Sequence, residues 1–365
     1  MISLLAATLI SLASPNPSNG VPQPLLSRLT TGVNITRWFC YLGADANDAH
    51  FANYLKEADY KNFSRIGAKF VRLCVSPDFI YSNGKPSANL AKIDVALSQL
   101  KRRKIAVIWD LHDNGQLGLD KPGSNGAGLV SFWSSLAKHY KGKYGTDVVF
   151  EVVNEPVFRD NPNDWYKLQA KVVAAIRKED PKRTIMVSPT SWSGIDSLKT
   201  MAVLPEKNLV YTFHCYDPFL FSHQGAEWVG DIPKNLNSLP FPSSPEAVQA
   251  VTGKNDAKYA GTLQDYGKQR FDAQYLDARL KIAVDWGNRN QVPVLLGEFG
   301  IYPKVAPVDS RARWFEAMKA AISRYKLPNA IWGYDDGLGL GRRLNADGSV
   351  WVDENVLTHF YKVKP

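Results

Sequence analysis

Short apolar runs alternate along the chain with segments of helical periodicity. The apolar runs are rich in valine, isoleucine and aromatic residues, which predicts β-strands covered on both faces, as in a parallel sheet. They are GVNITR (32–37), KFVRLCV (69–75), IAVIWDLH (105–112), VVFEVVNE (148–155), TIMVSP (184–189), LVYTFHCY (209–216), VPVLLGEFG (292–300) and NAIWGYDD (329–336). Amphipathic helices are predicted between them, at residues 51–66, 89–103, 128–142, 163–179, 264–290, 309–325 and 354–362. Only the connection near 194–203 is short and weakly helical.

Eight strands alternating with about eight helices is the count of a (β/α)₈ barrel. Two doubly wound domains would also supply eight strands, but no Gly-, Pro- or Ser-rich linker divides the middle of the chain. We therefore predict an α/β fold with a single (β/α)₈ TIM barrel. Residues 217–262 carry many Pro, Ser, Asn and Gly residues and no helical period. We predict that they form a long loop after strand six, over the open face of the barrel.

The N-terminal segment has a different character. Residues 1–13 are apolar, and Ser11-Leu12-Ala13 resembles a signal-peptidase site, although no Lys or Arg precedes the apolar run. We predict a signal peptide at 1–13, a linker or N-terminal extension at 14–29 and the barrel domain at 30–365. This places the protein outside the cell or in a periplasm. The alternative is a short apolar strand or helix packed on the domain. No later run reaches about 20 apolar residues, so no membrane span is expected.

Composition and charge narrow the class of protein. With 365 residues, of which 45% are hydrophobic and 22% charged, the chain is globular. The net charge of +9 is spread along the chain. The one dense run, KRRK (101–104), is predicted to be a solvated helix end, where cations suit the helix dipole, and the alternative is a nucleic-acid patch. Cys40, Cys74 and Cys215 match no metal motif and can form at most one disulfide in a monomer. No phosphate loop or dinucleotide fingerprint occurs, and we expect neither a metal nor another cofactor.

The carboxyl ends of the predicted strands carry most of the candidate chemistry. In a barrel these ends converge on one open face, where active sites lie. Two apolar strands end on acids, Glu155 in VVNEP and Glu298 in LLGEFG. One such acid alone would usually be a helix cap or a loop residue, but two converging acids favour a site. The other polar or aromatic residues at strand ends are Asn34, Arg37, Arg72, His112, Asn154, Trp192, His214, Tyr216 and Trp332.

A pair of carboxyl groups in different environments is what cleavage of a glycosidic bond requires, because one must hold a proton and the other must be ionised. At these positions the chain resembles glycoside hydrolase family 5, from about residue 30 to 362. Asn154-Glu155-Pro156 and Gly297-Glu298-Phe299-Gly300 match the two motifs of that family. The resemblance implies that Glu155 is the acid/base and Glu298 the nucleophile, with no metal. The supporting positions implied by the resemblance are Arg72, His112 in Asp110-Leu111-His112, His214, Tyr216 and Trp332.

Physical roles can be assigned to these residues within the resemblance. Arg72 should keep Glu298 ionised, and Tyr216 can hydrogen-bond the same carboxylate. Asn154 can donate to a sugar 2-hydroxyl. His112 and His214 offer donors to sugar hydroxyls or carboxylates, the alternative being satisfied core histidines. Trp332 offers a plate for a sugar ring, the alternative being core packing.

The resemblance implies a secreted retaining endo-β-glycanase that acts as a monomer on a β-linked polysaccharide or oligosaccharide. β-1,4-Glucan is the leading substrate, and β-mannan and β-1,3- or mixed-linkage glucan are the alternatives. A carbohydrate-binding barrel without catalysis is the alternative of another class. Trp38, Trp192 and Trp228 are predicted to support substrate binding. The wider set of aromatic residues expected at the open face adds Phe39, Tyr41, Tyr302 and Tyr334.

Overall fold

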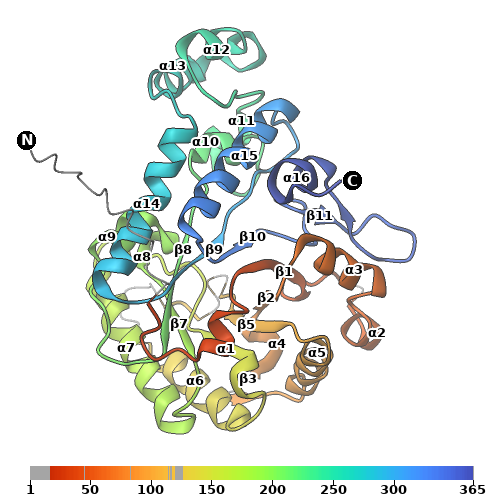
Figure 1. The fold of residues 1–365 in the computed structure, drawn as a ribbon, viewed down its shortest axis with the longest axis vertical. Coiled ribbons are helices and arrows are strands. Elements are labelled where there is room, and N and C mark those ends of the chain that lie inside the picture. The colour runs from red at the N-terminus through yellow and green to blue at the C-terminus, as the bar shows by residue number, and fades with distance from the viewer. Residues whose placement is uncertain are drawn as a thin grey trace, which may run out of the picture.

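Eight parallel strands close into a barrel, as the alternation of strands and helices predicts (Figure 1). The computed structural model describes residues 17–364 apart from 45, 83, 114, 116 and 120–125. Around the barrel the strand order is β1-β10-β9-β8-β7-β6-β5-β2, and every neighbouring pair is parallel. The barrel strands are β1 (Thr31–Phe39), β2 (Phe70–Val75), β5 (Ala106–Leu111), β6 (Val148–Glu151), β7 (Ile185–Val187), β8 (Leu209–His214), β9 (Val294–Glu298) and β10 (Asn329–Ile331).

Helices cover the outside of the barrel. The main ones are α3 (Glu57–Ile66), α5 (Leu90–Arg102), α6 (Ala127–Tyr140), α7 (Pro162–Glu179), α9 (Ile195–Thr200), α14 (Ala273–Asn290) and α15 (Val308–Tyr325). The shorter helices are α2 (Asp48–Ala52), α4 (Pro77–Ile80), α8 (Thr190–Ser193) and α16 (Glu354–Val356), which continues into the π-turn η4 (Leu357–Tyr361). A 3-10 turn, η1 (Gly145–Asp147), precedes β6. Two short hairpins lie outside the barrel sheet, β3 (Tyr81–Ser82) with β4 (Lys85–Pro86) and β11 (Gly341–Arg342) with β12 (Trp351–Val352).

Two predicted helices are divided in the structure. The segment 51–66 breaks between α2 and α3, where Lys56 is the N-cap of α3 and Asp59 accepts a hydrogen bond from the Lys56 amide. The segment 264–290 breaks between α13 (Ala260–Lys268) and α14, where the Asp272 side chain caps the amide of Tyr275. In both places an aspartate side chain accepts a hydrogen bond from a backbone amide at the start of the new helix. Helical periodicity alone did not show these breaks.

The barrel interior changes from apolar to polar toward the carboxyl ends of the strands. Inward-facing positions alternate along each strand. Ile108 of β5 and Val149 of β6 belong to a buried apolar layer, and two positions further along the same strands carry Asp110 and Glu151, both fully buried. The near-continuous apolar runs therefore contain buried charges that lie directly beneath the open face.

Helix α1 (Gln23–Leu26) closes the other end of the barrel. Its Leu25 is fully buried, and Val21 and Leu29 pack with it against the lowest apolar layer of the strands. Residues 17–29 were expected to be linker or extension, but this burial makes them part of the packing of the barrel. The predicted signal peptide at 1–13 lies outside the described residues. The KRRK run at 101–104 is exposed at the end of α5, as predicted for a solvated helix end.

The long segment after β8 is more ordered than predicted. It contains α10 (Phe219–Ser222), α11 (Asp231–Asn235), α12 (Pro245–Gln249), η2 (Thr252–Lys254) and η3 (Ala257–Tyr259) before α13. Figure 1 shows α12 and α13 projecting from one side of the barrel. These helices were not predicted because Pro and Ser are typical of loops, whereas here they begin helices. In α12 the Ser244 side chain accepts a hydrogen bond from the Ala247 amide, and Pro245 occupies the first helical position. Phe221 packs on Phe241, which joins this segment to the hydrophobic core.

Two further features bear on the predictions of the sequence. Cys40, Cys74 and Cys215 are all buried, and no disulfide joins any two of them. None of the helices in the described part of the chain is both long enough and apolar enough to cross a membrane.

Candidate active site

A cleft of about 820 Å³ lies at the carboxyl ends of the barrel strands. It brings together residues that end or follow seven of the eight barrel strands, and residues from the segment after β8. Nine of the eleven predicted site residues line it: His112, Asn154, Glu155, Trp192, His214, Tyr216, Trp228, Glu298 and Trp332. The two exceptions are Arg72, which lies beneath the cleft, and Trp38, which lies in the core.

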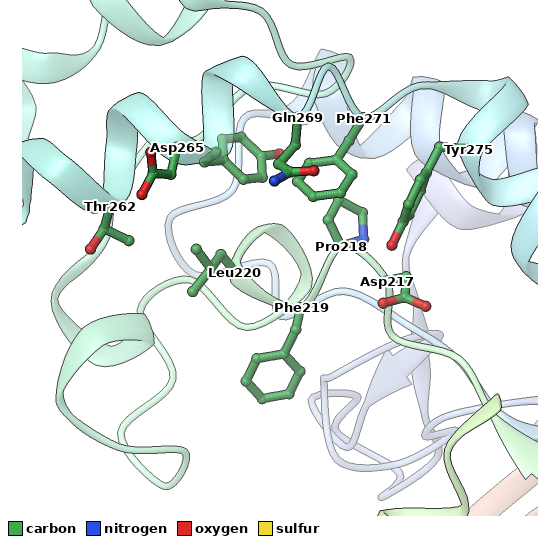
Figure 2. A pocket seen from close by; sticks show the side chains of 10 residues that line it. Asp217, Pro218, Phe219, Leu220, Thr262, Asp265, Gln269, Phe271 and Tyr275 are labelled. Atoms are coloured by element: carbon green, nitrogen blue, oxygen red, sulfur yellow. The ribbon is translucent and has the colours of Figure 1, made fainter. Parts of the chain in front are cut away.

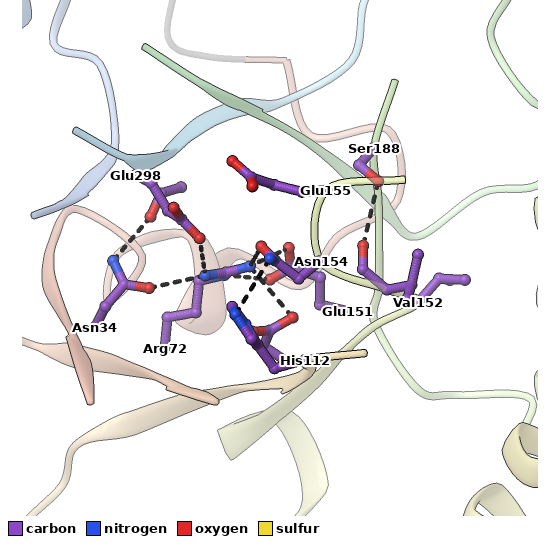
Figure 3. Close-up of polar contacts among 12 residues, drawn as sticks. Asn34, Arg72, His112, Glu151, Val152, Asn154, Glu155, Ser188 and Glu298 are labelled. Carbon is purple, nitrogen blue, oxygen red and sulfur yellow. Dashed lines mark hydrogen bonds and ion pairs between the residues drawn. The ribbon is translucent and has the colours of Figure 1, made fainter. Parts of the chain in front are cut away.

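Arg72 is the centre of a buried ion and hydrogen-bond network (Figure 3). Its Nε and Nη2 donate to the two carboxylate oxygens of Glu151 at 2.7 and 2.9 Å. Its Nη1 donates to Glu298 Oε1 at 2.7 Å and to Asn34 Oδ1 at 2.9 Å. Nη2 also donates to Asn154 Oδ1 at 2.8 Å. A planar guanidinium with all its edges bonded in this way has one fixed orientation.

Two donors hold the Glu298 carboxylate from different sides. Arg72 donates to Oε1, and the Tyr216 hydroxyl donates to Oε2 at 2.9 Å. Glu298 is the last residue of β9, and its neighbour Gly297 has no room for a side chain. A Cβ there would lie 2.5 Å from Thr212 Oγ1 and 3.1 Å from His214 Nε2. The glycine of the GEFG motif thus lets the side chains of β8 lie against β9.

The apolar run at 148–155 suggested that a strand ends on Glu155, but the strand ends earlier. Strand β6 ends at Glu151, and Glu155 follows four residues later with a left-handed backbone (φ 45°). Its Oε1 lies 2.8 Å from His214 Nδ1. Burial raises the pKa of Glu155 to about 7, against the opposing charges of His112 and Arg72. Burial also lowers the pKa of His214 to about 4, so this imidazole is neutral near pH 7.

The two carboxyl groups face each other across His214. The Nδ1 atom of His214 lies 2.8 Å from Glu155 and 3.5 Å from Glu298. One oxygen of each carboxyl group and this nitrogen all lie within 4.8 Å of one another. Separations of about 5–5.5 Å between carboxyl groups are typical of retaining glycosidases, whereas inverting enzymes need about 6.5–9.5 Å.

His112 connects the cleft to the buried network. Its Nδ1 lies 2.9 Å from Asp110 Oδ2, and its Nε2 lies 2.9 Å from the hydroxyl of Tyr41. Burial acts to lower the pKa of His112, but the hydrogen bond and the charge of Asp110 outweigh it and raise the pKa. Trp332 stacks on the same imidazole with ring centroids 5.6 Å apart. Trp332 has contacts on the protein side and also lines the cleft, so packing and substrate contact are compatible roles.

The expected aromatic set divides into cleft and core residues. Trp192 and Trp228 are 42% and 59% exposed and line the cleft. Trp228 packs edge-on against Tyr302 at 4.9 Å. Trp38 was expected to support substrate binding, and this prediction is wrong. Its ring is fully buried, stacks on Phe39 and Tyr54, and donates from Nε1 to the Phe51 carbonyl. Phe39 and Tyr334, also expected at the open face, are fully buried as well.

The sequence analysis did not identify the roles of two residues at the site, Glu151 and Tyr41. Glu151 was hidden inside an apolar run, yet a glutamate in a strand covered on both faces was itself a signal of a buried ion pair. Burial raises the pKa of Glu151 to about 7, against the charge of Arg72. Tyr41 was expected only as an aromatic plate. Its hydroxyl instead bonds His112, and this contact depends on a left-handed turn after β1 (φ 47°) that no pattern showed.

Two groups of side chains in the described residues have the spacing of metal ligands. They are Cys74, Asp110 and His112, and Glu155, His214 and Glu298. In the first group Asp110 lies 3.2 Å from the Arg72 guanidinium, and in the second Glu298 lies 2.7 Å from it. A cation fixed this close opposes a second cation. We assign no metal role to either group.

A second cavity of about 310 Å³ adjoins the cleft (Figure 2). Asp217 and Phe219 belong to the walls of both. Figure 2 shows the Phe219 ring pointing away from Gln269 and Phe271, which lie on the far side of this cavity. The segment after β8 therefore forms one wall of the cleft and encloses a further hollow behind that wall.

Two carboxyl groups that face each other at the open end of a (β/α)₈ barrel are the arrangement by which glycoside hydrolases cleave O-glycosyl bonds. Residues 35–336 match the family model of the cellulases, glycosyl hydrolase family 5. The chain belongs to this family, as the two glutamate motifs suggested, and it is a glycoside hydrolase.

Curated relatives and solved structures agree with this assignment. The chain is 26% identical over 315 residues to endoglucanase C of Acetivibrio thermocellus, covering 83% of this chain and 90% of the relative. It is 27% identical over 345 residues to endoglucanase 3 of Fibrobacter succinogenes, covering 87% of this chain and 51% of the relative. Its fold is similar to that of Thermotoga maritima Cel5A in complex with cellobiose, with a TM-score of 0.72, 23% identity and coverage of 93% and 100%. It is also similar to the cellulose synthase subunit Z of Clostridioides difficile, with a TM-score of 0.71, 23% identity and coverage of 91% and 99%.

Proposed function

We propose that this glycoside hydrolase is a secreted, retaining endo-β-1,4-glucanase that works by double displacement. The observation that carries the proposal is the facing pair of carboxyl groups, with oxygens within 4.8 Å of each other and with different partners. The names of the curated relatives, which are endoglucanases, favour β-1,4-glucan. A cleft of about 820 Å³ with exposed tryptophans suits the apolar faces of several sugar rings. Secretion stays a prediction based on residues 1–13.

In the first step, Glu298 attacks the anomeric carbon and Glu155 gives its proton to the glycosidic oxygen as the bond to it breaks. The surroundings of the two groups suit these roles. Glu298 accepts hydrogen bonds from Arg72 on one oxygen and from Tyr216 on the other, which fix the orientation of its carboxylate. Glu155 has a pKa raised to about 7 by burial and retains a proton in mildly acidic solution. The products are the shortened glycan and a covalent glycosyl ester of Glu298.

In the second step, Glu155, now a carboxylate, takes a proton from water. The hydroxide attacks the anomeric carbon and Glu298 leaves with its electron pair. Arg72 and Tyr216 stabilise the departing carboxylate. Asn154 is held through its oxygen by Arg72, and its amide nitrogen, which lies 3.4 Å from His112 Nε2, has a second hydrogen to donate to the sugar 2-hydroxyl. Two displacements at one carbon retain its configuration.

The experiment is hydrolysis of a panel of soluble β-1,4-glucan, β-1,3-glucan, mixed-linkage glucan and β-mannan, with detection of reducing sugar. We expect β-1,4-glucan to be the preferred substrate and its viscosity to fall early, as endo action requires. Proton NMR of the first product should show the β-anomer. An initial α-anomer would overturn the two-step mechanism, and a preference for mannan would change the substrate. A folded protein that binds glucan but releases no sugar would instead be a binding barrel.

A further inference from the structure

An unusual backbone presents Trp192 to the cleft. Ser191, Trp192 and Ser193 are consecutive residues in the left-handed region, with φ of 56°, 56° and 55°. Left-handed backbone costs about 1–2 kcal/mol for each non-glycine residue. Such strain persists where surrounding contacts enforce it, and it gathers at functional sites. Here the amides of Ser191 and Trp192 donate to the carbonyls of Val157 and Pro156, at 3.1 and 3.2 Å. The turn after β7 is thus tied to the loop that follows Glu155.

Arg159, on that same loop, covers the Trp192 ring. Its guanidinium carbon lies 4.1 Å from the ring centroid, and both residues line the cleft. The loop reaches this position through another left-handed residue, Phe158 (φ 40°), whose ring packs on Trp165. A guanidinium stacked by its face on an aromatic ring still offers its N–H groups along its edge. The stack therefore fixes a flat cation at the cleft wall.

Arg159 differs from the other charged groups around the cleft. The second arginine of the lining, Arg279, is neutralised by Asp196 at 2.9 Å and Asp217 at 2.8 Å. Glu298 is paired with the buried Arg72. Within the described residues, no ion pair joins Arg159 to a carboxylate. An exposed, stacked guanidinium with no carboxylate counter-ion in the described part of the chain is a ready partner for an anionic group on a ligand.

We propose that Arg159 and Trp192 form a subsite for a sugar unit or aglycone that carries a carboxylate, so that the enzyme accepts β-glycans bearing uronic acids. This inference rests on the proposed function. Glu155 protonates the leaving group in that mechanism, and Arg159 and Trp192 are anchored to the loop of Glu155. The subsite therefore lies on the leaving-group side of the scissile bond. Trp192 supplies a plate for the ring, and Arg159 donates to the carboxylate.

The test uses two aryl cellobiosides that differ in charge, 4-carboxyphenyl β-cellobioside and its neutral carboxamide analogue. For each protein we take the ratio of kcat/KM on the carboxylate to kcat/KM on the amide, and we compare this ratio between Arg159→Gln and the unmodified protein. The intrinsic difference between the two leaving groups cancels in this comparison. We expect kcat/KM for the carboxylate to fall about fivefold, the effect of a partly exposed ion pair, and kcat/KM for the amide to change less than about twofold. High salt should reduce the difference.

Two control variants separate this role from others. Arg289→Gln removes the same charge from an exposed position near the carboxyl end of α14. This end of the helix leads into the start of β9, at the opposite end of the barrel from the cleft, so the ratio should stay unchanged. Arg159→Lys keeps the charge without the planar fork and should give an intermediate ratio. Equal losses on both substrates in Arg159→Gln, with or without a lower Tm, would overturn the proposal and make Arg159 a packing partner of Trp192. Failure to hydrolyse either cellobioside with unmodified protein would instead count against the proposed function.

Discussion

Glu151 holds Arg72 by two hydrogen bonds, of 2.7 and 2.9 Å, and the remaining terminal nitrogen of Arg72 lies 2.7 Å from Glu298. Asp110 lies 3.2 Å from the same guanidinium. The buried guanidinium of Arg72 thus contacts three buried carboxyl groups, and of these only Glu298 lines the cleft. The geometry makes Glu151 a positioning residue, which acts on Glu298 through Arg72.

Glu151→Gln tests this positioning role. The amide retains one acceptor but turns an N–H₂ group toward the guanidinium, so Arg72 loses its fixed orientation. A lost hydrogen bond to a charged group is worth about 1.5–3 kcal/mol, and we expect kcat/KM on an aryl cellobioside to fall roughly 10- to 100-fold. Steady-state kinetics and thermal unfolding measure the two consequences. A folded variant with a normal rate would show that Arg72 needs no help from Glu151.

The raised pKa of Glu155 predicts the alkaline limit of activity. The protonated carboxyl group is the competent acid, so activity is present below its pKa and is lost as the pH rises through about 7. The pH profile of kcat/KM on a β-1,4-glucan measures this limb. A dinitrophenyl cellobioside needs no proton on its leaving group and provides the control, because its cleavage should continue above pH 7. The same alkaline limb on both substrates would assign the titration to another group.

Azide rescue distinguishes the two glutamates. Glu298→Ala should abolish hydrolysis, and azide should then occupy the space of the lost carboxylate and attack from its side, giving the inverted α-glycosyl azide. In Glu155→Ala, azide should instead open the glycosyl ester and give the retained β-product. Proton NMR of the glycosyl azides reads both outcomes. An inverted product from Glu155→Ala, with no rescue of Glu298→Ala, would exchange the two roles.

Trp228 is 59% exposed at the cleft wall formed by the segment after β8. A stacking residue far from the scissile bond contributes equally to ground state and transition state, so its loss raises KM with little change in kcat. We expect Trp228→Ala to lower kcat/KM for cellohexaose more than for cellotriose. Trp351→Ala removes an exposed tryptophan from the β11–β12 hairpin and is the matched control. Equal losses on both oligosaccharides together with a lower Tm would identify Trp228 as packing.

The sequence by itself determined the fold class and the two glutamates. Alternating apolar runs and amphipathic segments specify the barrel because strands buried on both faces need helices to cover them. The motifs around Glu155 and Glu298 consist of consecutive residues, so they can be recognised in the sequence alone. Asn154 and Gly297, which precede the two glutamates, were identified for the same reason.

Only the tertiary structure decided which side chains share the site. Arg72 and Glu298 are 226 positions apart and meet because barrel closure brings strand ends together. Trp38 turns into the core, while Tyr41, three residues later, has a left-handed backbone and reaches His112. Backbone turns beyond the strand ends have no periodicity to detect. The spatial partners that enforce them, such as the contact of Trp192 with Pro156, exist only in the folded chain.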